Sequence, residues 1–427
     1  MGDGEQAAPG RPMRVLMINY EFPPIGGGTG MACSQLLGEL ADRPDVMIDL
    51  VTSGTAPRPR IETFANNIRI HRLPVAKRDL FYWRAGELVQ WTRQAIAHAR
   101  KLSAGQTYDV CHCWAGWPSG IVGYVIRKRV PYLVSLRGSD VPGYSRRLRF
   151  LDPLLMRHVV RRVWEHAARV VAVSRNLRDL ALRTWPNAPI DVIPNGVDIH
   201  RFNPPAIAGN ELRVLFVGRL VERKGAHVLI QAFQGVLAAV PDAMLMIVGD
   251  GPQRAGLEAM AQDLGIRKQI VFRGHVDGAD MPLAYREGIV MVLPALADAM
   301  PNVVLEAMAS GLAIVTTPIG GSEIVRSNGV TVPFNDPDAL CQALVGYLTD
   351  PERLHVHQRE SRRLAEGMSW AAVADFKLQL YQEVAEMGAH RLDQAPREFQ
   401  LRPKPAERQV RRQLVARAAR PVHPTSP

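Results

Sequence analysis

Long hydrophobic runs and a secretory leader are both missing from this sequence of 427 residues. No apolar stretch reaches the roughly 18 residues that a membrane-spanning helix needs. The first residues, MGDGEQAAPGRP, have neither the basic start nor the hydrophobic core of a signal peptide. The sequence therefore predicts a protein that stays in the cytoplasm.

Cysteine is also scarce, because the chain has only four cysteines and they are scattered. This number is too small for a disulfide framework. The run Cys111-His112-Cys113 could suggest a metal site, but alternation along a strand would point His112 away from both cysteines. Since no partner cluster exists in the sequence, we expect no metal.

Acidic residues are outnumbered by basic ones, and the formal net charge is +11. Such an excess fits an anionic partner, which could be a phosphate, a membrane surface or a nucleic acid. About half of the excess lies beyond Arg391, in a proline-containing tail that we expect to be largely disordered. Zinc-ligand spacing, aromatic interleaving and RNA-binding signatures are absent, which argues against nucleic acid.

Two successive series of short apolar runs, with helical patterns between them, dominate the rest of the chain. This rhythm predicts βαβ units and parallel sheets, and 47% hydrophobic residues are enough for two cores. The runs cover residues 14–19, 46–51, 68–73, 110–113, 132–136 and 170–173 in the first half, and 214–217, 244–248, 270–272, 289–293, 313–316 and 330–332 in the second.

Ligands of parallel sheets bind beyond the carboxyl ends of the strands, so the residues that follow each run are the candidates. In the first half these are Gly26, Gly27 and Gly28 of a glycine-rich loop, then His112, Trp114, Arg137, Asp140 and Ser174. The glycines are contiguous and come late after the strand, unlike a dinucleotide fingerprint. A flexible loop, and a structural ion pair between Arg137 and Asp140, remain the alternatives.

A basic amphipathic segment, residues 144–169, mixes arginines with Leu, Val, Met and Trp. Such a surface can lie on an anionic membrane. The alternative is an ordinary solvated helix face.

In the second half, Gly218 and Arg219 end a strand, and Lys224 opens the next helix. Backbone amides and the helix dipole already favour anions there, so the two basic side chains fit a diphosphate. Further along, Asp298 and Glu306 stand in a strand-loop-helix segment with little other charge, where carboxylates can bind a polyhydroxylated ligand. For Arg219 and Lys224 the alternative is that both are solvated on a turn. For the two acids it is that Asp298 lies in a solvated loop and that Glu306 interacts with the positive end of a helix.

The second half resembles the retaining glycosyltransferases of family 4, which have the two-domain GT-B fold. Their acidic signature commonly reads E-G-M-P-N-V-V-L-E-A-M-A, and residues 298–309 match it at all but the first two letters, where Asp298 and Ala299 stand. Gly218-Arg219 and Lys224-Gly225 match the family motif G-R-x-x-x-x-K-G. Trp114 occupies a position where members often have a histidine that faces the donor sugar.

The resemblance implies an α/β protein of GT-B architecture, with two Rossmann-like domains facing each other across a cleft. We expect an acceptor-side domain at 13–200, a linker at 201–210, a nucleotide-sugar domain at 211–365, a crossover helix at 366–388 that packs on the first domain, and the basic tail at 389–427.

The resemblance also implies roles for the site residues. Arg219 and Lys224 would hold the donor pyrophosphate, Asp298 the hydroxyls of the donor sugar, and Glu306 the ribose. Donor binding would further involve Gly218, Asp250, Gly251, Gly274, His275, Val276, Ala299, Met300, Pro301, Asn302 and Val303. The acceptor side would include the glycine loop, His112, Trp114, Arg137, Asp140, Ser174 and Asn195.

The function that follows is a metal-independent, retaining transfer from a nucleotide-diphosphate sugar, with no other cofactor. The acceptor would be a lipid-linked or polysaccharide glycan of the cell surface, and the basic segments would allow peripheral attachment to the inner face of the membrane. Two alternatives remain, a sugar-nucleotide-binding protein or scaffold without catalysis, and, more distantly, an oxidoreductase.

Overall fold

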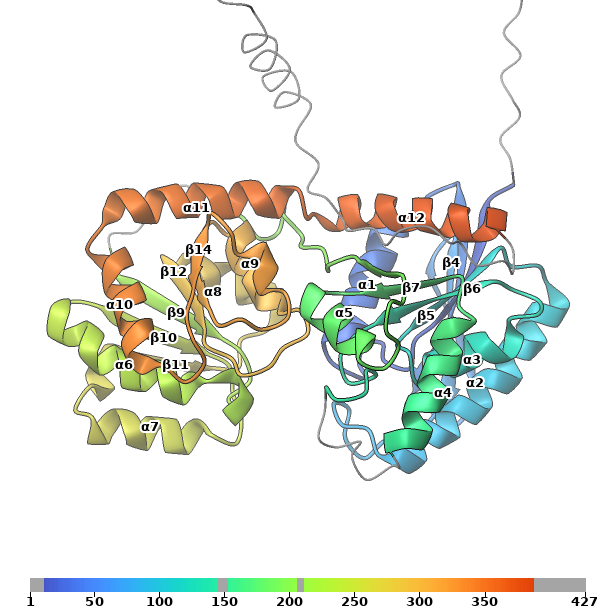
Figure 1. The fold of residues 1–427 in the computed structure, drawn as a ribbon, viewed down its shortest axis with the longest axis horizontal. Helices are drawn as coiled ribbons and strands as arrows, with labels where there is room; N and C mark the ends of the chain where they lie inside the picture. Colours follow the sequence, from blue (N-terminus) through green and yellow to red (C-terminus); the bar gives the residue numbers. More distant parts are fainter. Residues whose placement is uncertain (1–10, 145–152, 206–210, 388–427) are drawn as a thin grey trace, which may run out of the picture.

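A computed structural model describes residues 11–144, 153–205 and 211–387. Within these residues the chain forms two α/β domains side by side, each with helices packed around one sheet (Figure 1). The first sheet has the strand order β3-β4-β2-β1-β5-β6-β7-β8 and the second has the order β11-β10-β9-β12-β13-β14. All strand pairs are parallel except β3 with β4. The parallel α/β rhythm predicted from the sequence is therefore confirmed.

The N-terminal domain is built from apolar runs that become fully buried central strands. Its strands are β1 (Met13–Ile18), β2 (Val46–Gly54), β3 (Arg60–Ala65), β4 (Ile68–Pro74), β5 (Val110–Trp114), β6 (Tyr132–Leu136), β7 (Arg169–Ala172) and β8 (Ile190–Val192). Its helices are α1 (Gly28–Leu40), α2 (Ala85–Gly105), α3 (Ser119–Ile126), α4 (Pro153–Glu165) and α5 (Arg175–Leu182). The carboxyl ends of its central strands face the second domain.

The C-terminal domain repeats the design. Its strands are β9 (Arg213–Val217), β10 (Met244–Val248), β11 (Ile270–Gly274), β12 (Val290–Leu293), β13 (Ala313–Thr316) and β14 (Gly329–Thr331). Its helices are α6 (Ala226–Ala239), α7 (Arg254–Asp263), α8 (Met281–Arg286), α9 (Asn302–Ala309), α10 (Pro337–Leu348) and α11 (Pro351–Glu366), with short 3-10 turns between some of them.

A last helix, α12 (Trp370–Met387), lies against the N-terminal domain, so the chain crosses back between α11 and α12 (Figure 1). Its apolar face, including Val373 and Val384, packs in one core with α1. The hydroxyl of Tyr381 is 2.7 Å from Nδ1 of His112 on β5. The crossover is therefore anchored by both apolar packing and a buried hydrogen bond.

The segment 144–169 differs from the amphipathic surface that the sequence suggested, although residues 145–152 lie outside the described part. Val160, Val163 and Trp164 on α4 are buried in the domain core, whereas Arg157 and Arg162 are exposed. The apolar half of the helix thus stabilises the protein itself, and only a basic face remains for a partner. The basic tail also lies outside the described residues. No helix in the described ranges is long and apolar enough to cross a bilayer.

Candidate functional site

The loop after β9 and the loop after β12 touch each other at Gly225. This glycine has φ of +74°, and a Cβ on it would lie 2.0 Å from the carbonyl oxygen of Pro294. The amide of Leu296 donates to the carbonyl of Arg223 at 2.8 Å. Only a residue without a side chain permits this approach. The approach places Lys224 beside the loop after β12, the acidic loop, which carries Asp298.

Lys224 and Asp298 form an ion pair at the carboxyl edge of the second sheet. The distance from Lys224 Nζ to Asp298 Oδ2 is 2.6 Å, and both side chains are largely buried. The other carboxylate oxygen accepts from the amide of Ala299 at 2.8 Å. Arg219, just after β9, is exposed, and its side chain has no hydrogen bond or ion pair within the described residues. One paired and one unpaired cation therefore stand at the same edge.

Glu306 lies on α9, away from the ion pair, and accepts from the hydroxyl of Tyr285 at 2.7 Å. Burial raises the pKa of Glu306 above its ordinary value, while the Tyr285 hydrogen bond and the charge of Arg201 oppose that increase. Tyr285 could not be predicted from the sequence, because it is 21 residues away from Glu306 on another helix.

The remaining donor-binding candidates lie on loops that interlock with this edge. A Cβ on Gly249 would lie 2.0 Å from the carbonyl oxygen of Gly218, and the Gly249 amide donates to the Gly274 carbonyl at 2.8 Å. Asp250 accepts from the amide of Gly251, and His275 is exposed. The loops after β9, β10 and β11 therefore contact one another through backbone groups next to Arg219.

Two of the predicted residues join the domains across the site. The side-chain amide of Asn195 donates to the amide oxygen of Asn302 at 2.7 Å, and Arg137 donates to Asn195 at 2.9 Å. A Cβ on Gly138 would lie 3.2 Å from the Cβ of Ala299. The structure therefore brings the loop at 137–140 in the first domain against the loop that carries Asp298 in the second.

Two other interdomain residues were not predicted. A Cβ on Gly138 would lie 3.2 Å from both the ring of Tyr144 and Ala299, so Tyr144 lies near the acidic loop. Burial and then the charge of Asp298 raise the pKa of Tyr144 to about 12. Glu323 accepts from the amide of Arg175 at 2.6 Å, which links the loop after β13 to α5. The rule that ligand loops follow strands could have identified Glu323, whereas Tyr144 carries no local signal.

Several acceptor-side predictions need correction because the side chains are buried. Both ring nitrogens of His112 are occupied, by Tyr381 and Ser135, each at 2.7 Å. Trp114 is 1% exposed. In this arrangement neither can touch an acceptor, because α12 and neighbouring strands cover them. His112 does lie opposite the cysteines, whose sulfurs are 3.8 Å apart.

Asp140 and Ser174 are likewise buried and hold backbone rather than ligand. Asp140 accepts from the amides of Gly116, Arg137 and Gly138, so it shapes the loop after β6 instead of pairing with the Arg137 side chain. Ser174 caps α5.

The glycine loop, unlike these buried residues, is exposed. Gly27 and Gly28 are on the surface, and a Cβ on either would meet no atom within 4 Å. They leave open space at the start of α1.

Comparison with known proteins decides the family. Residues 27–196 match the family described as glycosyl transferase 4-like domain, and residues 211–350 match glycosyl transferases group 1. The chain belongs to the group 1 glycosyltransferases of family 4.

Relatives of this glycosyltransferase match over most of its length. An uncharacterised glycosyltransferase of Methanocaldococcus jannaschii is 27% identical, over 88% of this chain and 99% of its own. The GDP-mannose-dependent alpha-(1-6)-phosphatidylinositol monomannoside mannosyltransferase of Mycolicibacterium smegmatis is 27% identical, over 79% and 90%. Sucrose-phosphate synthase from Thermosynechococcus elongatus has a similar structure, with a TM-score of 0.72 and 24% identity over 87% of this chain and 99% of that one. The predicted GT-B fold is confirmed.

Proposed function

We propose that this glycosyltransferase moves a sugar from a nucleotide-diphosphate sugar to a glycan acceptor with retention of anomeric configuration and without a metal. The Lys224–Asp298 ion pair, next to the unpaired Arg219, is the observation that carries the proposal. A diphosphate beside Arg219 would meet a charge that no acidic side chain of the described residues pairs with. Among the described residues, no three His, Cys, Asp or Glu side chains gather as a metal site would require.

The proposed roles follow from these contacts. Arg219 and Lys224 neutralise the diphosphate as it departs, and a fixed positive charge in a desolvated site stabilises a leaving anion more than water does. Asp298, held by Lys224 and its own loop amide, presents its carboxylate to the hydroxyls of the donor sugar. Glu306, oriented by Tyr285, accepts from the ribose.

The way the two carboxylates are held argues against a covalent route through a carboxylate nucleophile. A retaining glycosidase places a carboxylate nucleophile and an acid about 5 to 5.5 Å apart on either side of the scissile bond. Asp298 and Glu306 instead have separate partners, Lys224 and Tyr285, on separate elements. We infer that the leaving phosphate helps to deprotonate the acceptor on the same face, so that catalysis is mainly positioning and electrostatics.

A panel of UDP-, GDP- and ADP-sugars tests this function. Each donor is assayed both for thermal stabilisation of the protein and for release of nucleoside diphosphate. We expect one donor class to stabilise the protein and to be turned over once an acceptor is present. Stabilisation without turnover across a range of glycan and glycolipid acceptors would favour the non-catalytic sugar-nucleotide binder, for which the Asp298 and Ala299 departures argue. Stabilisation by NAD alone would favour an oxidoreductase.

The pH dependence should report on Glu306. The raised pKa places loss of the carboxylate at a higher pH than for an ordinary glutamate, so turnover should fall on the acid side as Glu306 becomes protonated. Tyr285→Phe removes a hydrogen bond that favours the charged form. The acid limb of the kcat/KM profile should then move to higher pH. Tyr347→Phe, which changes a buried tyrosine hydrogen-bonded to His357, is the matched control and should leave the limb in place. A limb that stays fixed in Tyr285→Phe contradicts the role of Glu306.

We propose a lipid-linked or polysaccharide acceptor, reached at an anionic membrane surface through the basic face of α4. The Mycolicibacterium relative, whose name specifies a phosphatidylinositol mannoside, supports this choice. Each basic residue near such a surface contributes about 1 kcal/mol before screening.

Flotation with liposomes measures this attachment. The double variant Arg157→Gln/Arg162→Gln should reduce binding to anionic liposomes by about tenfold at low salt. The double variant Arg267→Gln/Lys268→Gln removes the same charge from the other domain and should have little effect. Equal retention of all three proteins, or no preference for anionic lipid, would reject the membrane proposal and favour a soluble acceptor.

A further inference from the structure

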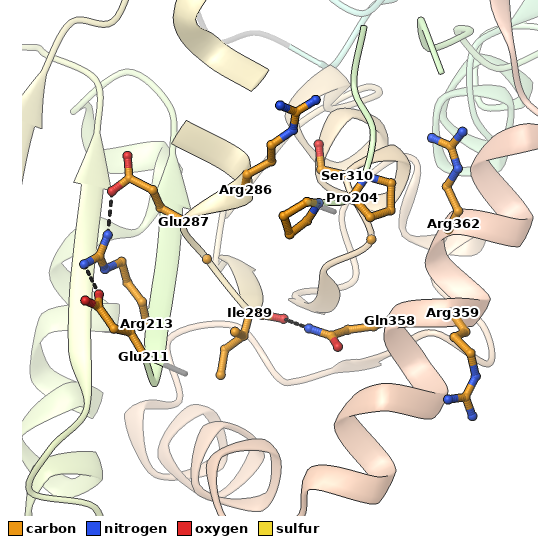
Figure 2. A pocket seen from close by; sticks show the side chains of 13 residues that line it. Pro204, Glu211, Arg213, Arg286, Glu287, Ile289, Ser310, Gln358, Arg359 and Arg362 are labelled. Atoms are coloured by element: carbon orange, nitrogen blue, oxygen red, sulfur yellow. Dashed lines mark hydrogen bonds and ion pairs between the residues drawn. The ribbon is translucent and has the colours of Figure 1, made fainter. Parts of the chain in front are cut away.

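A cavity of about 650 Å³ lies in the C-terminal domain, away from the candidate donor site (Figure 2). Its walls include residues that precede β9, β12 and β13, together with Pro204, Pro205 and one side of α11. It therefore lies at the amino edge of the sheet, whereas Arg219 and Asp298 follow strands at the carboxyl edge. The volume is in the range of about 300 to 1,000 Å³ that small-molecule sites occupy.

The wall combines apolar surface with a polar group that lacks a partner. Pro204, Pro205 and Ile289 supply apolar contacts. Ser310, at the end of α9, is 1% exposed, and its hydroxyl has no hydrogen bond within the described residues. An unpaired buried hydroxyl is costly. A ligand that reaches Ser310 would remove that cost.

The charge of the lining favours an anion. Its two acids, Glu211 and Glu287, are already paired with Arg213. Arg286 donates to the carbonyl and the side-chain oxygen of Asn203, which are neutral acceptors, so its charge is not compensated there. Arg359 is exposed and has no partner within the described ranges. Guanidinium groups suit phosphate because they donate two parallel hydrogen bonds.

We propose that this cavity binds a small organic phosphate, with its carbon skeleton against the two prolines, a hydroxyl on Ser310, its phosphate on Arg359 at the rim, and Arg286 in the opposite wall. The same elements reach the donor site. The amide of Ser310 donates to the carbonyl of Glu306, one turn earlier on α9, at 3.0 Å. Arg286 follows Tyr285, the partner of Glu306, and holds Asn203 in the interdomain linker.

A bound phosphate would therefore contact the linker and both helices that position Glu306. Binding at the cavity and binding at the donor site are thermodynamically coupled if a ligand in one site favours one arrangement of the shared linker and helices. We expect nucleotide affinity to change about fivefold when the cavity is filled. The expected effect on nucleotide affinity rests on the proposed function, whereas binding of the phosphate to the cavity does not.

The test uses the full chain and titration calorimetry with ribose 5-phosphate, glycerol 3-phosphate and inorganic phosphate, each to about 10 mM. Ribose and glycerol are the uncharged controls. At least one organic phosphate should bind, and its uncharged counterpart should not. Arg359→Glu should weaken binding about tenfold or more, because a charge-assisted contact becomes repulsive. Ser310→Ala should weaken binding without loss of stability. Lys268→Glu, which reverses an exposed charge outside the cavity, should leave binding unchanged.

The donor site is the obvious competitor for phosphate, so Arg219→Ala separates the two. Binding that survives Arg219→Ala and is lost in Arg359→Glu supports the cavity. Binding lost in Arg219→Ala but kept in Arg359→Glu, or no binding of either organic phosphate, overturns the proposal. Failure of the proposed function would appear separately, as absence of sugar-nucleotide turnover in a protein that still binds phosphate in the cavity.

Discussion

Replacing Lys224 by alanine is expected to lower kcat/KM for the sugar nucleotide by about 10² to 10³, because removal of one preorganised charge from a desolvated site costs about 3 to 4 kcal/mol of barrier. Lys224 is the only predicted phosphate-binding cation that contacts Asp298 in the described residues, at 2.6 Å. The variant thus loses two things together, a charge for the leaving diphosphate and the partner that orients the carboxylate for the sugar.

Steady-state kinetics with the donor found in the panel measure this loss, and circular dichroism checks that the variant is folded. Lys268→Ala, which removes an exposed lysine from the same domain, should behave like the wild type. Asp298→Asn keeps the shape of the side chain but leaves Lys224 without its anion, and should also reduce turnover. Turnover at the wild-type rate in Lys224→Ala would remove the basis of the proposed mechanism.

Those strands that are continuous apolar runs could be predicted from the sequence, and two that are not were missed. β3 has no buried residue, because it is an antiparallel edge strand, so its sequence RIETFA contains no apolar run. β8 is three residues long and includes Asp191. Burial on both faces is what makes a parallel strand visible in a sequence.

The site was predictable to the extent that its residues follow strands. A parallel sheet gathers the carboxyl ends of its strands at one edge, so Lys224 and Asp298, which are 74 residues apart, could be expected to meet. The same rule failed for His112 and Trp114, because β5 extends through Trp114 and because α12, from the far end of the chain, covers both side chains. No local sequence pattern predicts a contact between residues 269 positions apart, such as His112 and Tyr381.

The same crossover buries Lys377 of α12 against the N-terminal domain, and replacing this lysine should have a large effect on stability. The side chain is 4% exposed, and its Nζ lies 5.6 Å from the centre of the Trp114 ring. Burial and then the nearby charge of Arg137 lower the pKa of Lys377 to about 7, although Cys33 opposes this shift. No carboxylate pairs with the ammonium group within the described residues. The folded protein therefore holds a lysine whose charged form is disfavoured.

The direction of the pH effect follows from the two pKa values. In the unfolded chain Lys377 has an ordinary pKa near 10.5, so between about pH 7 and 10.5 the unfolded state binds more protons than the folded state. The free-energy cost of holding the charged lysine in the folded protein is therefore complete below about pH 7. It disappears as the pH rises from about 7 to 10.5. Each pKa unit corresponds to 1.36 kcal/mol, so at pH 6 the penalty is about 3 to 5 kcal/mol.

Lys377→Met replaces the lysine with an unbranched apolar side chain of similar length, which fits beside Trp114. We expect the free energy of unfolding to rise by about 3 to 5 kcal/mol at pH 6, and the gain to shrink towards pH 10 as the wild type itself becomes more stable. Urea unfolding of both proteins at several pH values measures the difference, with Lys268→Met as a control for an exposed lysine. A variant that is less stable than the wild type at pH 6, or a gain that does not depend on pH, would show that Lys377 is compensated in the folded protein.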